Sequence, residues 1–154
     1  MRLLVLSWRD LRHPGAGGSE FYVQSVLRHW AANGHAVTML AAASPGLAPV
    51  ERLEGYTIER RGNALTVYRE ARRLHGSALG FDAVLDVVNT RPFLTPRWLG
   101  DAPVVALIHQ VAREVWNYDV PRPLALLGRY VLEPRWLRSY RDVPVLTLSR
   151  SSRE

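Results

Sequence analysis

The residues best suited to chemistry lie in a glycine-rich segment near the start of the chain, His13-Pro14-Gly15-Ala16-Gly17-Gly18-Ser19-Glu20. Its glycines permit a ligand to approach the backbone closely and permit positive φ angles. A helix is predicted to start at Ser19, its expected N-cap, and to offer free N–H groups and a positive dipole end. Together these features predict an anion site that suits a phosphate. Glu20 is either a cleft residue or an acid that stabilises the first helical turn.

A second group of polar residues follows later apolar runs. His109 comes directly after the run 103–108 and is followed by Gln110, whereas Asn89 follows the run 81–88. A histidine in this position can hydrogen-bond a substrate hydroxyl or a phosphate, or it can satisfy a buried loop carbonyl. Asn89 is a candidate acceptor contact, although Asn is also an ordinary turn residue. His13, in the glycine-rich segment, is a further candidate for contact with substrate. No spacing of His, Asp and Glu suggests a metal site.

The elements that must position these residues alternate between strand and helix. Apolar runs predict strands at residues 2–8, 35–41, 56–60, 81–88, 103–108 and 143–148. Helical spacing predicts helices at 19–33, about 64–74 and about 123–133, and Pro134 is expected to interrupt the last one before a second piece at 135–141. Residues 42–55 are expected to be a loop. This alternation predicts an α/β fold with a Rossmann-like, doubly wound, mainly parallel sheet flanked by helices. Ligands bind such sheets at the carboxyl ends of the strands, which selects the loops after residues 8, 88, 108 and 148.

Size and composition limit the class of protein. The chain of 154 residues fits a single domain, 1–154, and its 47% hydrophobic and 22% charged residues are ordinary for a soluble protein. It has no apolar run of about 18 residues that would cross a membrane. The absence of cysteine excludes disulfide and thiol chemistry and is compatible with the cytoplasm.

The basic residues indicate a bias in amino-acid composition and not a particular type of binding partner. The formal net charge is +6, and all 20 basic residues are arginines. A GC-rich genome explains this bias better than nucleic-acid binding, so no nucleic-acid partner is expected. Arg135, Arg138 and Arg141 have helical spacing and are expected to form a solvated face. The second interpretation of that face is contact with lipid headgroups, at the inner surface of a membrane.

The glycine-rich segment differs from the fingerprint of dinucleotide-binding enzymes. Its pattern is Gly-x-Gly-Gly-Ser-Glu, so Glu20 stands where the third glycine of Gly-x-Gly-x-x-Gly belongs. The strand at 35–41 continues into alanines rather than into the acidic residue that would bind a ribose. An NAD-dependent reductase is therefore disfavoured.

The order of these motifs resembles the N-terminal domain of family 4 glycosyltransferases. The resemblance is carried by the opening strand, the Gly-Gly-Ser-Glu loop with its helix, the segment Asn-Gly-His-Ala-Val-Thr, the strand ending in His109, and the final Val145-Leu146-Thr147-Leu148-Ser149-Arg150-Ser151-Ser152. It covers essentially the whole chain. It implies a retaining enzyme with two Rossmann-like domains, the GT-B architecture. Such an enzyme uses a nucleotide-diphosphate sugar as donor substrate and needs no other cofactor.

The resemblance also implies roles for individual residues. Gly17 and Gly18 match the glycine pair that lies against the donor diphosphate, with Ser19 beside them. His109 matches the histidine that contacts the donor sugar at the reaction centre. Ser149 matches the serine that closes the last strand near the cleft. Arg150 stands where the family often has an acidic residue, and we assign it no role.

In the family, the N-terminal domain mainly binds the acceptor, and a C-terminal domain makes most donor contacts. That second domain is absent from this chain, so we expect little or no transfer of a hexose-type sugar by this half alone. Two other classes remain open. One is half of a sugar-nucleotide epimerase, which shares the architecture, and the other is a non-catalytic nucleotide- or sugar-binding module.

Overall fold

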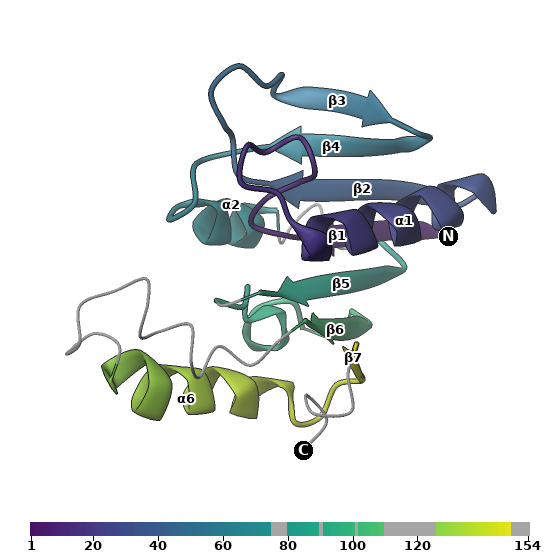
Figure 1. Ribbon diagram of the computed structural model, residues 1–154. Coiled ribbons are helices and arrows are strands. Elements are labelled where there is room, and N and C mark those ends of the chain that lie inside the picture. The colour runs from purple at the N-terminus through teal and green to yellow at the C-terminus, as the bar shows by residue number, and fades with distance from the viewer. Residues whose placement is uncertain (75–79, 90, 101, 110–125, 149–154) are drawn as a thin grey trace.

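Seven strands form one sheet in the order β3-β4-β2-β1-β5-β6-β7 (Figure 1). The computed structural model describes residues 1–74, 80–89, 91–100, 102–109 and 126–148. The strands are β1 (Arg2–Leu6), β2 (Ala36–Ala41), β3 (Val50–Leu53), β4 (Tyr56–Arg60), β5 (Ala83–Val88), β6 (Val104–Ile108) and β7 (Val145–Thr147). All neighbouring strands are parallel except β3 and β4, which pair antiparallel. The predicted α/β fold with a mainly parallel sheet is confirmed.

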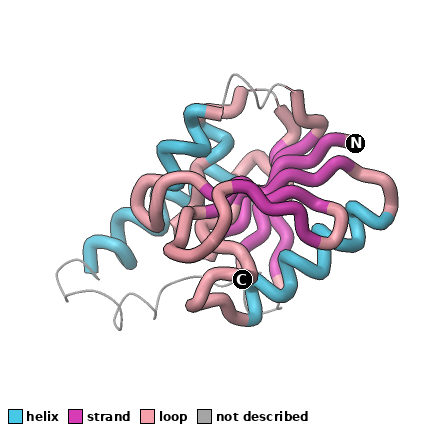
Figure 2. The backbone as a smooth tube through the Cα atoms, turned by 90° about the horizontal axis from the view of Figure 1, so that it is seen from above, coloured by secondary structure: helices cyan, strands magenta, loops and turns pink. Residues whose placement is uncertain are grey.

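Helices cover both faces of the sheet, as Figures 1 and 2 show. Helix α1 (Gly18–Ala32) buries Val23 and Leu27 on one face, and helix α2 (Val67–Arg73) packs on the other. Successive residues of a strand point to opposite faces. Strand β1 therefore contributes Leu3 and Val5 to the core under α1 and Leu4 and Leu6 to the core under α2. An almost continuous apolar run is what a strand buried on both faces requires.

The prediction of a loop over residues 42–55 is wrong at its end, where β3 forms a hairpin with β4. The two strands are joined by Glu54 and Gly55, whose φ angles are 45° and 93°. Two successive positive φ angles are typical of the tight turns that match the twist of a hairpin. Strand β3 is at the edge of the sheet and none of its residues is buried. It therefore lacks the apolar alternation that would have revealed it.

Pro134 does not interrupt the helical segment in which it lies. A π-helical turn, η2 (Gly128–Leu132), leads directly into α6 (Glu133–Leu137) and then into a 3₁₀ turn, η3 (Arg138–Tyr140). A proline ring normally clashes with the carbonyl four residues earlier. The wider π turn places the hydrogen bonds five residues apart and so relieves this conflict. Arg135, Arg138 and Arg141 are exposed, which agrees with the expected solvated face.

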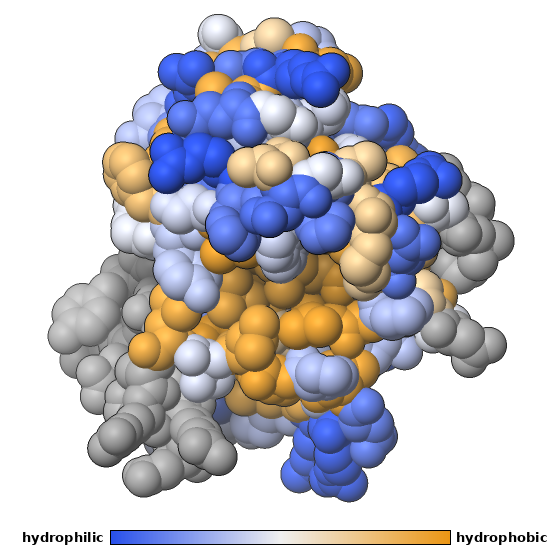
Figure 3. Space-filling model, turned by 90° about the vertical axis from the view of Figure 1, so that its right-hand side faces the viewer, coloured by the Kyte–Doolittle hydropathy of each residue, from blue (hydrophilic) through white to orange (hydrophobic). Residues whose placement is uncertain are grey.

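A hollow lies at the edge of the sheet where the parallel strands begin. It is a cavity of about 280 Å³ with a mainly apolar lining that includes Met1, Leu3, Trp30, Ala83 and Leu146. Figure 3 shows an apolar area in the middle of this side of the molecule. The hollow lies away from the carboxyl ends of the strands, where the polar residues gather. None of the helices in the described ranges has the length and apolar character needed to cross a bilayer.

Candidate functional site

Strands β1, β5 and β6 are neighbours in the sheet, so their carboxyl ends lie side by side (Figure 1). The loop from Ser7 to Gly17 follows β1, Asn89 follows β5 and His109 follows β6. The backbone N–H of His109 donates to the carbonyl of Val88 over 3.3 Å, which continues the pairing of β5 with β6 past the end of β6. The structure therefore brings the glycine-rich loop, Asn89 and His109 to one edge of the sheet.

Glu20 is at the centre of this edge, where it is buried and accepts four hydrogen bonds. Its Oε1 accepts from Arg9 Nε at 2.9 Å, Ser19 Oγ at 2.8 Å and Asn89 Nδ2 at 3.1 Å. Its Oε2 accepts from the backbone N–H of Gly17 at 2.7 Å. The side chain is only 1% exposed. Glu20 thus holds the loop, the helix start and the end of β5 together, and it is a positioning residue rather than an open cleft residue.

Burial acts on the pKa of both Glu20 and His109, and the two shifts have different additional causes. Burial alone would raise the pKa of Glu20, but hydrogen bonds from Arg9, the Gly17 N–H and Ser19 outweigh it, so its pKa is lowered. Burial lowers the pKa of His109, and the negative charge of Glu20 only partly opposes this effect. A pKa below the ordinary value of about 6.5 favours the neutral form of His109 at pH 7. The ring centroids of His109 and Tyr22 are 5.7 Å apart in an edge-on arrangement, and among the described residues the buried Nε2 of His109 has no hydrogen-bond partner.

Helix α1 begins at Gly18, one residue before the predicted range 19–33, and its N-cap lies two residues before Ser19. The N-cap is Gly17, not Ser19, because the carboxylate of Glu20 reaches back to the Gly17 N–H, as in half of a capping box. None of Gly15, Gly17 and Gly18 has a positive φ, so the chain needs no glycine there for its backbone conformation. A Cβ at Gly18 would meet nothing within 4 Å. Among the described residues, none therefore fills the space beside the Cα of Gly18.

His13 shapes the loop. Its Nδ1 accepts from the backbone N–H of Gly15 at 3.0 Å, and its ring meets Trp8 edge-on at 5.6 Å. No described contact links His13 to Asn89 or His109. Gln110 and Ser149, also predicted at this edge, lie outside the described residues.

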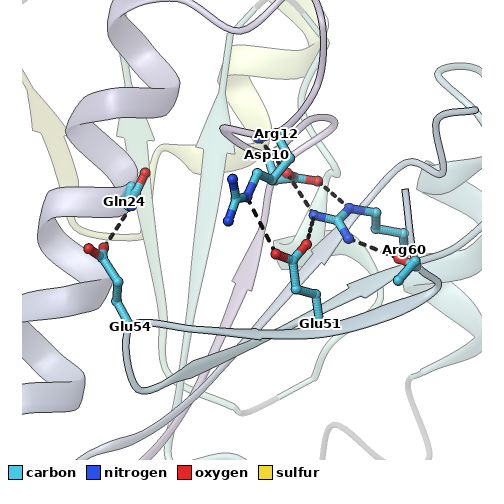
Figure 4. Close-up of polar contacts among 7 residues, drawn as sticks. Asp10, Arg12, Gln24, Glu51, Glu54 and Arg60 are labelled. Atoms are coloured by element: carbon cyan, nitrogen blue, oxygen red, sulfur yellow. Dashed lines mark hydrogen bonds and ion pairs between the residues drawn. The ribbon is translucent and has the colours of Figure 1, made fainter. Parts of the chain in front are cut away.

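A network of buried charges that sequence reasoning missed ties the loop to the neighbouring hairpin (Figure 4). Arg60 donates to both carboxylate oxygens of Asp10, at 2.8 and 3.0 Å, and to Glu51 at 2.8 Å. The side chains of Arg60 and Asp10 are 0% and 1% exposed. The sequence does contain a signal for this network. Tyr56, Ile58 and Arg60 alternate with period two along β4, so Arg60 points inward with the other two. An arginine in such a position requires a buried partner.

A second network that was not predicted from the sequence surrounds Asp86, which is fully buried in β5. It accepts from the hydroxyl groups of Thr95 and Tyr140, at 2.8 and 2.5 Å, and from the backbone N–H groups of Phe93 and Thr95. Tyr140 in turn accepts from the N–H of Leu94, a residue with a φ of 57°. An acid within the apolar run of β5 was the signal for such a network. It holds the segment after β5, which includes η1 (Thr95–Arg97), against η3.

The site combines backbone N–H groups at a helix start, an arginine, an amide and a neutral imidazole. Such groups bind an anion and hydroxyl groups through directed hydrogen bonds. Within the described ranges, no cluster of His, Asp and Glu is arranged to hold a metal ion.

The model of Glycosyltransferase Family 4 matches residues 16–153. The chain belongs to glycosyltransferase family 4. This confirms the resemblance carried by the strand, loop and helix motifs. No protein with a curated description matches the sequence.

Among solved structures, this family 4 chain resembles sucrose-phosphate synthase from Thermosynechococcus elongatus, with a TM-score of 0.57 and 16% sequence identity. The match covers 96% of this chain and 47% of the synthase chain, so the family 4 chain spans about half of that protein. At this identity the likeness shows the fold alone. It confirms the Rossmann-like α/β arrangement of a GT-B glycosyltransferase domain.

Proposed function

We propose that the chain is the N-terminal, acceptor-side domain of a retaining glycosyltransferase that transfers a hexose-type sugar from a nucleotide diphosphate to an acceptor. The observation that carries the proposal is the convergence of the glycine-rich loop, Asn89 and His109 at one sheet edge, in a chain of glycosyltransferase family 4. In this proposal Gly17, Gly18 and Ser19 receive the donor diphosphate. His109 contacts the donor sugar at the reaction centre.

The remaining roles follow from this arrangement. Asn89 and His13 are proposed to contact the acceptor, and the same role for Gln110 and Ser149, which lie outside the described residues, stays a prediction. Glu20 acts through the residues it holds. A neutral His109 suits contact with a sugar hydroxyl, because a neutral imidazole both donates and accepts hydrogen bonds. The proposal includes a donor nucleotide sugar, an acceptor, a C-terminal domain and a cytoplasmic location.

The need for a second domain is supported by the extent of the structural match, which covers 47% of the synthase chain. Transfer requires the donor and the acceptor to be held in a fixed mutual orientation, which two domains achieve by closing around them. We therefore propose that this domain alone has little or no transferase activity.

A ligand titration tests the proposal. UDP- and GDP-sugars are titrated against the protein and against the His109→Gln and Asn89→Ala variants, with NADPH as the competing class of ligand. We expect a nucleotide sugar to bind, and release of its sugar to require both His109 and the C-terminal domain. Tight binding of NADPH without binding of any nucleotide sugar would overturn the proposal. Interconversion of the donor sugar without an acceptor would favour an epimerase.

A further inference from the structure

Arg9 follows β1 and its side chain is held from two directions. Its Nε donates to Glu20 Oε1 at 2.9 Å, and its Cζ lies 4.5 Å above the ring of Trp8. An arginine carries five N–H donors in a planar fork. Within the described part of the chain, the two Nη groups make no hydrogen bond or ion pair.

The comparison with Arg60 shows what a purely structural arginine looks like in this protein. Arg60 is fully buried and uses Nε and both Nη groups on Asp10, Glu51 and the carbonyl of Ala48. Arg9 also contacts a buried carboxylate, but through Nε alone, and its side chain stays 24% exposed. Its fork is therefore fixed in place while most of its donors remain available.

The available donors of Arg9 lie beside the glycine-rich loop. A Cβ placed on Gly15 would be 3.5 Å from Nη1 of Arg9. The carboxylate of Glu20 binds Arg9, Ser19 Oγ and the Gly17 N–H at once, so the guanidinium lies within one side chain of the start of α1. Two sets of donors therefore lie along the glycine-rich loop, one beside Gly15 and the other at the start of α1. These are the Nη groups of Arg9 and the first N–H groups of the helix.

We propose that Arg9 grips the diphosphate group that binds at the glycine-rich loop, and that Trp8 and Glu20 hold it ready to do so. This inference rests on the proposed function and adds a residue to its donor site. A planar guanidinium binds phosphate oxygens in a bidentate manner, and the helix start offers donors to the adjacent phosphate. Glu20 balances the charge of Arg9, so the affinity comes from directed hydrogen bonds more than from net charge. The Trp8 and Glu20 contacts lower the entropy cost of binding, because the side chain is already ordered.

Binding measurements on Arg9→Gln and Arg9→Lys test this proposal. Arg12→Gln is the matched control, because Arg12 lies in the same loop with a side chain 53% exposed. Pyrophosphate, UDP, inorganic phosphate and uridine are titrated by calorimetry into each protein. We expect Arg9→Gln to weaken binding of pyrophosphate and UDP about tenfold, or about 1.4 kcal/mol, and to leave uridine binding unchanged. Arg9→Lys should recover only part of this loss, because an ammonium group lacks the planar fork. If Arg9→Gln is too unstable to assay, Arg9→Lys is compared with Arg12→Gln instead.

The outcomes separate this inference from the proposed function. Equal affinity of Arg9→Gln and Arg12→Gln for pyrophosphate and UDP would overturn the role of Arg9 and leave the glycosyltransferase proposal standing. Binding of pyrophosphate that requires Arg9, without binding of any UDP- or GDP-sugar, would keep the diphosphate site and overturn the proposed function. A loss confined to inorganic phosphate would overturn the diphosphate assignment. Failure of the unchanged protein to bind either pyrophosphate or UDP would overturn it as well.

Discussion

Asn89 Nδ2 donates to Glu20 Oε1 over 3.1 Å, although 69 residues separate the two in the chain. The bond joins the end of β5 to the first turn of α1. Because the same carboxylate also accepts from Arg9, Ser19 and the Gly17 N–H, one buried side chain sets the relative positions of three segments of the candidate site.

Loss of the Glu20 carboxylate should destabilise the fold. Glu20→Ala leaves Arg9, Asn89 and the Gly17 N–H without their acceptor, and we expect the free energy of unfolding to fall by about 3 kcal/mol. Urea denaturation measures this change in the free energy of unfolding. Glu59→Ala is the control, because Glu59 pairs with Arg61 at the surface and should cost less than about 1 kcal/mol. Equal losses in the two variants would show that Glu20 does not hold the site together.

The pKa of His109 should lie below the ordinary value of about 6.5, because burial disfavours its charged form. The unfolded chain then takes up a proton at a higher pH than the folded one. The contribution of His109 to stability is therefore complete above a pH of about 6.5. It falls as the pH drops through the pKa of His109 in the folded protein. An NMR titration, with the signal assigned by its loss in His109→Gln, checks the direction. Glu20→Gln should lower this pKa further, since it removes the negative charge that raises it, and an increase would contradict the assignment.

Arg60 and its sequence neighbour Arg61 should differ sharply in their effect on stability. Arg60→Gln leaves the buried Asp10 carboxylate without its cation, and we expect a loss of about 3 kcal/mol. Arg61→Gln removes only a surface pair, with a side chain 47% exposed, and should change the free energy of unfolding by less than about 1 kcal/mol. Thermal and urea unfolding provide the comparison. Hydrogen exchange in residues 9–17 should quicken in Arg60→Gln alone, because Asp10 anchors that loop, and unchanged exchange would show that the anchor is not needed.

Removal of one hydroxyl should reveal the contribution of the Asp86 network. Tyr140→Phe takes a donor from a fully buried carboxylate and an acceptor from the Leu94 N–H, so we expect a loss of about 2 kcal/mol. Tyr130→Phe, at a position 65% exposed, should be neutral within about 0.5 kcal/mol. Burial raises the pKa of the Tyr140 hydroxyl, so its contribution should also fade as the pH rises above about 10, where the unfolded phenol ionises first. Equal stability of the two variants, measured by urea unfolding, would contradict this account.

Gly18 should matter for ligand binding rather than for folding. A Cβ there meets no atom of the described residues within 4 Å and the φ angle is not positive, so Gly18→Ala should leave stability within about 0.5 kcal/mol. The same methyl group would occupy the open space above the helix start, and we expect weaker binding of UDP. Gly62→Ala is the contrast, because its φ is 64° and its Cβ would lie 2.5 Å from Thr66 Oγ1. That variant should lose stability by at least about 1 kcal/mol. Undiminished UDP affinity in Gly18→Ala would show that no ligand approaches the loop at this point.

The sequence by itself determined the α/β class, the parallel strands and the placement of the glycine-rich loop, Asn89 and His109 at strand ends. These follow from hydrophobic periodicity and turn chemistry, which act over a few residues and can be read locally. The tertiary structure decided the rest. It made Glu20 a buried anchor rather than an open cleft residue and moved the start of α1 to Gly18, because Glu20 reaches the Gly17 N–H. It also gave Arg60 and Asp86 partners up to 50 and 54 residues away. A charge within an apolar run signals that a partner exists, but only the packed fold determines which residue satisfies it.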